Sequence, residues 1–209
     1  LECQGRVVAI LPGPPFELQP MFENHVLPRL TAFLGEKQTI IKSRILKLYG
    51  IGESQAEEQV KDLVGSTNPT LASYAKPTEI QFRLTAKAFS QAEADNLLQS
   101  LENKLYARLG PYIFARDEDT MQAVLGRLLS QHSLSLALAE SCTGGLAANW
   151  LTDVPGSSVY FQGGVISYSN ELKTGLLQVP TELLHRHGAV SCEVAIAMAH
   201  GIRRLAQAD

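Results

Sequence analysis

The sequence predicts a mixed α/β protein, in which a small α+β unit precedes a three-layer α/β unit with parallel strands. A strictly alternating strand at residues 78–86 lies between segments with helical spacing of apolar residues. After residue 120, helical segments alternate with short apolar segments, as is typical of a parallel sheet covered by helices. The 209 residues are 45% hydrophobic and 19% charged, which supplies enough apolar material for a core.

Residues 1–35 are predicted to be the end of a domain. RVVAILPGPP, residues 6–15, has β-branched residues before a proline-rich break, which predicts a strand buried on both faces. Pro14 and Pro15 fit the first turn of a helix, which Pro20 and Pro28 limit or break. Because neither end of the chain reads as the boundary of a complete fold, we expect it to be part of a longer protein.

Residues 36–116 are predicted to form the α+β unit, with the order β-α-β-β-α over residues 37–110. The strand at 78–86 should bury one face and expose the other, as in an antiparallel sheet covered by helices on one side. The following helix, residues 91–110, has Ser90 as its expected N-cap. Residues 111–120 read as a linker with turn character.

Residues 117–209 are predicted to form the three-layer unit. Thr120 is the expected N-cap of its first helix, and apolar strands follow at 133–141 and 163–169. The helix after the first strand should hold Gly144 and Gly145 in its first turn. Two further helices are expected at 180–188 and 191–208, with Thr181 and Ser191 as caps.

Composition narrows the function classes. A net charge of −3 gives no general attraction for nucleic acid or an anionic membrane. There is no apolar run of about 18 residues and no signal peptide, so we expect a cytoplasmic protein without a membrane partner. The cysteines, Cys3, Cys142 and Cys192, fit no zinc spacing and are expected to be reduced, small buried residues. His185 and His187 do not share a helix face, so no metal site is predicted.

The segment ESCTGG, residues 140–145, is the first candidate site. A strand that passes through a glycine-rich turn into a helix offers free amides and a positive helix end to an anion such as phosphate. The expected binding residues are Ser141, Thr143, Gly144 and Gly145. The alternative is an ordinary helix capped by Ser141 or Thr143, and a further one is a reactive Cys142 thiolate at the helix start.

The second candidate site combines Ser157 and Ser158 with Tyr168 and Lys173. A serine nucleophile needs a base, and Lys173 is the nearest candidate in the sequence. A lysine acts as a base only where burial or a nearby positive charge favours its neutral form. The phenol of Tyr168 could relay a proton or hold the lysine. The alternatives are a solvated lysine and a half-buried strand tyrosine.

Four motifs in order carry a family resemblance: ESCTGG, VPGSS, GGVISYSNELK and HGAVSCEVA. Together they resemble the start of the carboxy-terminal domain of the CinA family, the competence/damage-inducible proteins. VVAILPGPPFELQPMFENHVLPRL resembles the end of the amino-terminal CinA domain, which is similar to molybdopterin-binding domains. LKLYGIGESQAEEQV resembles the start of the KH-like domain between the two.

The resemblance implies hydrolysis of nicotinamide mononucleotide to nicotinic acid mononucleotide and ammonia, without a cofactor. It places the nucleophile on Ser158, the base on Lys173 and the helper on Tyr168, and Ser141 also falls on a functional position. Which serine attacks stays open. Ser157 joins the substrate-binding residues, and the oxyanion amides are expected near Ser157, Ser158 or Gly163.

The resemblance also implies a homodimer and, for the amino-terminal domain of some members, ADP-ribose pyrophosphatase activity with a metal ion. One alternative function is therefore a nucleotide-binding or pyrophosphatase protein. Another is a competence factor that binds nucleic acid through the KH-like unit. YGIGES lacks the Gly-x-x-Gly spacing of a KH clamp and carries acidic residues, so we expect nucleic acid not to be a partner and the unit to be a spacer or dimer element.

Overall fold

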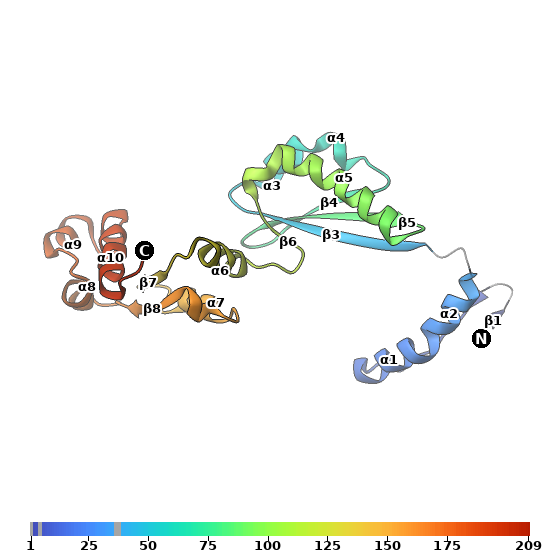
Figure 1. Cartoon of the computed structure of the whole chain (residues 1–209), viewed down its shortest axis with the longest axis horizontal. Coiled ribbons are helices and arrows are strands. Elements are labelled where there is room, and N and C mark those ends of the chain that lie inside the picture. The colour runs from blue at the N-terminus through green and yellow to red at the C-terminus, as the bar shows by residue number, and fades with distance from the viewer. Residues whose placement is uncertain (1, 4–5, 36–38) are drawn as a thin grey trace. The chain divides into compact units, whose positions relative to one another are not determined.

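A computed structural model describes residues 2–3, 6–35 and 39–209 of the chain (Figure 1). Its contacts divide the chain into two compact units, residues 1–113 and residues 114–209. The mixed α/β class is as predicted. Among the described helices, none is long and apolar enough to cross a membrane.

The amino-terminal segment is a short antiparallel ribbon followed by a long helical stretch. Its elements are β1 (Glu2–Cys3), β2 (Arg6–Val7), α1 (Pro15–Met21), the π-helix η1 (Phe22–Val26) and α2 (Leu27–Leu34). Pro15 occupies the first turn of α1, as predicted, and the π-helix follows Pro20, so the helical stretch is broken as expected.

The prediction of a buried strand in residues 6–15, ahead of the proline-rich break, is wrong in the length of the strand and in its burial. Only Arg6–Val7 forms a strand, and its partner is another two-residue strand. None of residues 6–35 whose exposure is described is buried, and Ile10 is 86% exposed. A two-stranded ribbon without a covering layer has no dry face, so apolar residues alone do not bury it.

The α+β unit has the predicted order β-α-β-β-α. Its elements are β3 (Ile40–Leu48), α3 (Glu53–Gln59), α4 (Lys61–Val64), β4 (Thr70–Ala75), β5 (Ile80–Ala88) and α5 (Gln91–Leu109). β5 pairs antiparallel with both β3 and β4. After a 3-10 turn, β6 (Ile113–Arg116) continues the sheet order β4-β5-β3-β6, so the predicted linker at 111–120 contains a strand instead.

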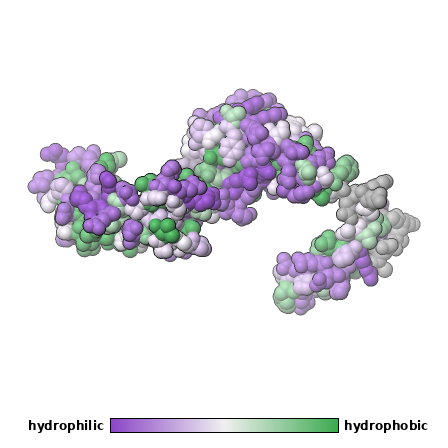
Figure 2. Space-filling model, viewed as in Figure 1, coloured by the Kyte–Doolittle hydropathy of each residue, from purple (hydrophilic) through white to green (hydrophobic). Residues whose placement is uncertain are grey.

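The core of this unit follows the alternation seen in the sequence. Ile80, Phe82, Leu84 and Ala86 of β5 are buried, and α5 packs against the strand with Leu98 and Leu105. Ser90 caps α5 as predicted, since its side chain accepts from the Glu93 amide at 3.2 Å. Figure 2 shows a mainly hydrophilic surface over α3, α4 and α5, as expected for the solvent-facing side of packed helices.

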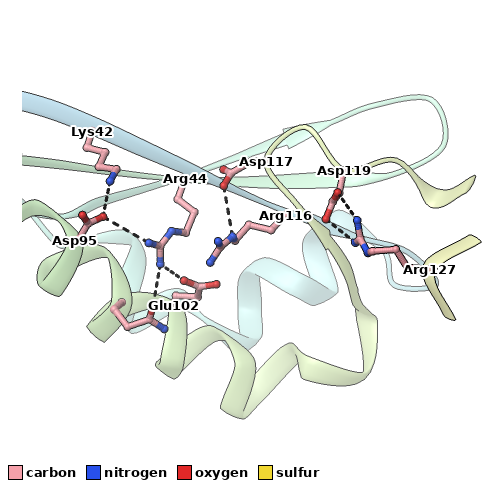
Figure 3. Close-up of polar contacts among 9 residues, drawn as sticks. Lys42, Arg44, Asp95, Glu102, Arg116, Asp117, Asp119 and Arg127 are labelled. Carbon is pink, nitrogen blue, oxygen red and sulfur yellow. Dashed lines mark hydrogen bonds and ion pairs between the residues drawn. The ribbon is translucent and has the colours of Figure 1, made fainter. Parts of the chain in front are cut away.

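Charged residues on the helix-facing side of β3 pair with α5 (Figure 3). The guanidinium of Arg44 forms an ion pair with Glu102 and lies 3.8 Å from Asp95. Lys42 binds Asp95 at 2.6 Å. The side chains of Arg44 and Glu102 are only 11% and 4% exposed, so this ion pair belongs to the interior of the unit.

The second unit alternates helices and parallel strands, as predicted. Its elements are α6 (Met121–His132), β7 (Leu136–Glu140), α7 (Leu146–Thr152), the 3-10 helix η4 (Ser157–Val159), β8 (Phe161–Ile166), α8 (Asn170–Leu177), α9 (Thr181–His187) and α10 (Cys192–Ala206). β7 and β8 pair in parallel.

Helices cover both faces of the β7–β8 pair. Ala137, Ala139 and Val165 pack on one face against the cluster that α8, α9 and α10 supply. Gly164 faces α7, since a Cβ there would lie 3.8 Å from the Cβ of Ala148. A Cβ at Gly201 would overlap the Leu177 carbonyl, so this glycine lets α10 approach α8 closely.

The local predictions for this unit have mixed outcomes. Thr120 and Ser191 cap α6 and α10, each through a hydrogen bond of 3.3 Å. Thr181 does not cap α9, because Pro180, in the extended conformation, occupies the N-cap. The thiols of Cys142 and Cys192 are exposed and free, so the prediction that they are buried is wrong. The side chain of Cys3 lies outside the described residues.

Candidate active site

Lys173 is the centre of the candidate site. It lies one turn into α8, whose first turn Ser169 caps by accepting from the Leu172 amide at 3.2 Å. Its side chain is buried, with the residue 1% exposed, which excludes the solvated-lysine alternative. Its Nζ lies 3.1 Å from Ser141 Oγ, 2.7 Å from the Ser167 carbonyl oxygen and 2.9 Å from the Tyr168 carbonyl oxygen.

The parallel pairing of β7 and β8 explains how these residues meet. The carboxyl ends of neighbouring parallel strands lie at one edge of a sheet, where α/β proteins place their ligand sites. Ser141 follows β7, and Ser167 and Tyr168 follow β8. The Ser167 amide donates to the Glu140 carbonyl at 2.8 Å, which extends the pairing by one residue and aligns the two strand ends.

Glu140 is a buried carboxylate beside Ser141, with 6% of the residue exposed. One of its oxygens accepts from the amides of Gly145 at 3.0 Å and Ala147 at 3.2 Å, and the other from that of Ala148 at 2.8 Å. Burial alone would raise the pKa of Glu140, but hydrogen bonds from the Thr143 hydroxyl and these amides outweigh it and lower the pKa.

The turn between β7 and α7 differs from the predicted helix start. Gly144 and Gly145 have φ values of +62° and +98°, so they form a left-handed turn before the helix and not its first turn. Gly145 is the N-cap of α7 and supplies no side chain, so neither Ser141 nor Thr143 is the cap. Phosphate binding by this turn stays a prediction, but the amides of Gly145, Ala147 and Ala148 already have an internal acceptor.

The other predicted residues lie differently from Ser141. Ser158 is exposed in η4, and in the part of the chain that the structure describes no hydrogen bond joins it to Lys173. Ser157 is half-buried in the same turn. The Tyr168 side chain is 74% exposed, so the half-buried alternative does not hold, and it is the carbonyl of this residue that contacts Lys173.

Two residues of the site were missed in the sequence. Ser167 is fully buried and supplies a carbonyl to Lys173, and Glu140 binds the start of α7. The one available signal for Glu140 was a carboxylate at the end of an otherwise apolar strand, directly before the glycine-rich turn. Within residues 2–3, 6–35 and 39–209, no group of three or more His, Cys, Asp or Glu residues is placed to hold a metal ion.

Comparison with known proteins assigns a family to both parts of this architecture. The family model for the CinA C-terminal domain matches residues 118–209, and that for the damage-inducible protein CinA KH domain matches residues 43–115. A competence-damage inducible protein of Moorella thermoacetica is 54% identical over 209 residues, which are 100% of this chain and 50% of the relative. One from Caldicellulosiruptor bescii is 50% identical over 202 residues, 96% of this chain and 48% of the relative.

The solved structures include similar proteins. The crystal structure of a competence/damage inducible protein from Agrobacterium tumefaciens is 39% identical, with a TM-score of 0.41, and covers 42% of this chain and 53% of that chain. The chain spans about half the length of the curated relatives that it matches. The chain belongs to the CinA family, with a CinA KH domain followed by a CinA C-terminal domain.

Proposed function

We propose that the second unit hydrolyses the carboxamide of nicotinamide mononucleotide, with Ser141 as nucleophile and Lys173 as base. The observation that carries this proposal is the set of contacts around the buried Nζ of Lys173. A neutral amine has two N–H donors and one lone pair. Two partners of Nζ are carbonyl oxygens, which can only accept, and the third is a hydroxyl, which can donate. In the structure Nζ donates to all three groups, and a neutral Nζ in the same position would donate to the two carbonyl oxygens and accept from the Ser141 hydroxyl, which is the geometry required of the base.

Ser141 is a better nucleophile than Ser158 on this geometry. A nucleophile and its base should lie within hydrogen-bonding reach, and Ser141 Oγ lies 3.1 Å from Nζ. Lys173 is buried with its Nζ held against Ser141, which is the placement required of the base. The proposal therefore transfers the attacking role from Ser158 to Ser141 and keeps Lys173 in the role expected from the sequence.

The reaction follows in two halves. Ser141 Oγ attacks the carboxamide carbon and passes its proton to Lys173 Nζ, and the protonated lysine returns it to the departing ammonia. Water then attacks the Ser141 ester, Lys173 takes its proton, and the same proton restores the Ser141 hydroxyl as nicotinic acid mononucleotide leaves. Cys142 directly follows the proposed nucleophile in the sequence. From this position its backbone amide would donate to the oxyanion.

Ammonia release from nicotinamide mononucleotide by the full-length gene product tests the activity. Ser141→Ala and Ser158→Ala are the matched variants. We expect Ser141→Ala to lower kcat by about 1,000-fold or more, and Ser158→Ala to keep most of the rate, because loss of a nucleophile leaves only binding and oxyanion stabilisation. The opposite ranking would return the nucleophile to Ser158, and no ammonia from the wild-type protein would reject the activity.

A further inference from the structure

We propose that Glu140 is a positioning residue for Ser141 and that its carboxylate keeps external anions, including the substrate phosphate, away from the start of α7. This inference rests on the proposed function for its kinetic part only. The carboxylate is buried, it directly precedes Ser141, and both of its oxygens bind backbone amides of the same helix start.

Glu140 closes the loop that carries Ser141. The loop leaves β7 at Glu140 and enters α7 at Leu146, and hydrogen bonds tie the Glu140 carboxylate to Gly145, Ala147 and Ala148. Inside the loop, the Gly144 amide donates to the Ser141 carbonyl at 3.1 Å. Because both ends of the loop are held by one residue, removal of that carboxylate should let Ser141 Oγ drift from Lys173. A displacement of about 1 Å can cost about 100-fold in rate.

The same contacts explain why an anion should not bind there. The first amides of a helix are the groups that hold phosphate in many proteins, because they lack partners within the helix. Here the amides of Gly145, Ala147 and Ala148 have a carboxylate partner from the chain itself. A second anion would displace these bonds and meet a like charge. The substrate phosphate should therefore be held by other groups.

Glu140→Ala tests both parts with one variant. It leaves three backbone amides around a space of about the size of a carboxylate, so formate should bind there and restore part of the lost function. We expect kcat to fall about 10- to 100-fold with KM nearly unchanged, and added formate to recover at least part of kcat. The matched control is Glu182→Ala, which removes an exposed glutamate in the first turn of α9. Its kcat should equal that of the wild type, both with and without formate.

A second readout does not depend on catalysis. Formate and inorganic phosphate should raise the Tm of Glu140→Ala in a concentration-dependent way and leave the wild-type Tm unchanged. If the wild-type protein releases no ammonia, the proposed function has failed, and these Tm shifts alone decide the inference. If Glu140→Ala does not fold, Glu140→Gln replaces it in the kinetic comparison, since its amide oxygen keeps some of the contacts.

Two results would overturn the positioning role of Glu140. One is a folded Glu140→Ala protein with unchanged kcat, which would show that Ser141 is held without the carboxylate. The other is an increase in KM at constant kcat, which would mean that Glu140 contacts the substrate and does not act through Ser141. Phosphate binding to the wild-type turn, detected as a Tm increase that the Glu140 variant loses, would contradict the exclusion of anions.

Discussion

The two units bury carboxylates in different ways. In the α+β unit, Glu102 forms an ion pair with the guanidinium of Arg44. In the second unit, Glu140 and Lys173 are both buried, yet within the described residues no ion pair joins them. Backbone amides bind Glu140, and two carbonyls and a hydroxyl bind Lys173. The same kinds of charged group therefore have charged partners in one unit and neutral partners in the other.

The difference fits a structural role in the first unit and, under the proposed function, a chemical role in the second. A buried ion pair holds both partners in their charged forms, because loss of either charge leaves the other unpaired in the interior. The partners of Lys173 are all neutral groups, and in the proposed mechanism a proton passes between Nζ and Ser141 while the two carbonyl contacts remain.

Removal of Lys173 should have the largest effect. Lys173→Met keeps an apolar chain of similar length in the buried site and removes the base, so kcat for ammonia release should fall by about 1,000-fold or more. Lys61→Met is the matched control, because the side chain of Lys61 is 74% exposed, and its rate should be unchanged. A folded Lys173→Met protein with near wild-type kcat would show that Lys173 is not the base.

Disruption of the buried ion pair should act on stability alone. Arg44→Met removes a guanidinium partner of Glu102 from the interior, which should destabilise the α+β unit by up to about 3–5 kcal/mol. The double variant Arg44→Met/Glu102→Leu should recover part of this loss, because the buried carboxylate is removed together with the guanidinium. Thermal unfolding measures the stability, and the ammonia assay should show no change in kcat below the unfolding temperature. A loss of kcat in the folded variant would show that the pair is not purely structural.

Sequence patterns predicted the parts of the fold that depend only on residues close to one another in the sequence. The alternation of Ile80, Phe82 and Leu84 set the buried face of β5, and Ser90 was recognisable as a cap from its own segment. The two-residue ribbon at Arg6–Val7 was not predictable in this way, because burial of a strand depends on a second layer and not on its own residues.

The sequence indicated the lysine of the candidate site and the candidate serines. It did not indicate which serine contacts the lysine. Lys173 and Ser141 are 32 residues apart, and only the parallel register of β7 and β8 brings them together. Ser158 is closer to Lys173 in sequence but lies in an exposed 3-10 turn. Glu140 was missed because its carboxylate reaches amides five to eight residues ahead, and the left-handed turn at Gly144 and Gly145 makes that reach possible.

Acidification should weaken the contacts of Glu140. A glutamate whose pKa is lowered by folding stabilises the native state above its ordinary pKa, which is near 4.5, and that contribution disappears as the pH falls through the lower native value. The free energy of unfolding of the second unit should therefore fall below about pH 4.5, by at most about 1.4 kcal/mol per pH unit for this one group.

Comparison with Glu140→Gln isolates this contribution from the other carboxylates of the unit. The difference in stability between wild type and variant should be constant above about pH 4.5 and should shrink as the pH falls. Chemical denaturation at a series of pH values measures it. A difference that stays constant down to pH 2 would mean that the amides of α7 do not favour the ionised carboxylate.

The smallest expected effect comes from the end of α8, where a substitution should change the stability of the second unit and leave the contacts of Lys173 as they are. Gln178 ends α8 in the left-handed conformation, with φ of +57°, which glycine adopts at lower cost. Gln178→Gly should stabilise the second unit by about 0.5 kcal/mol, or about 2–4 °C in Tm, and leave kcat unchanged. Ala199→Gly, at an exposed position inside α10, should have the opposite sign, with a loss of about 1 kcal/mol. If kcat instead follows Tm in both variants, the rate depends on the stability of the unit as a whole, and the neutral partners of Lys173 are not what sets it.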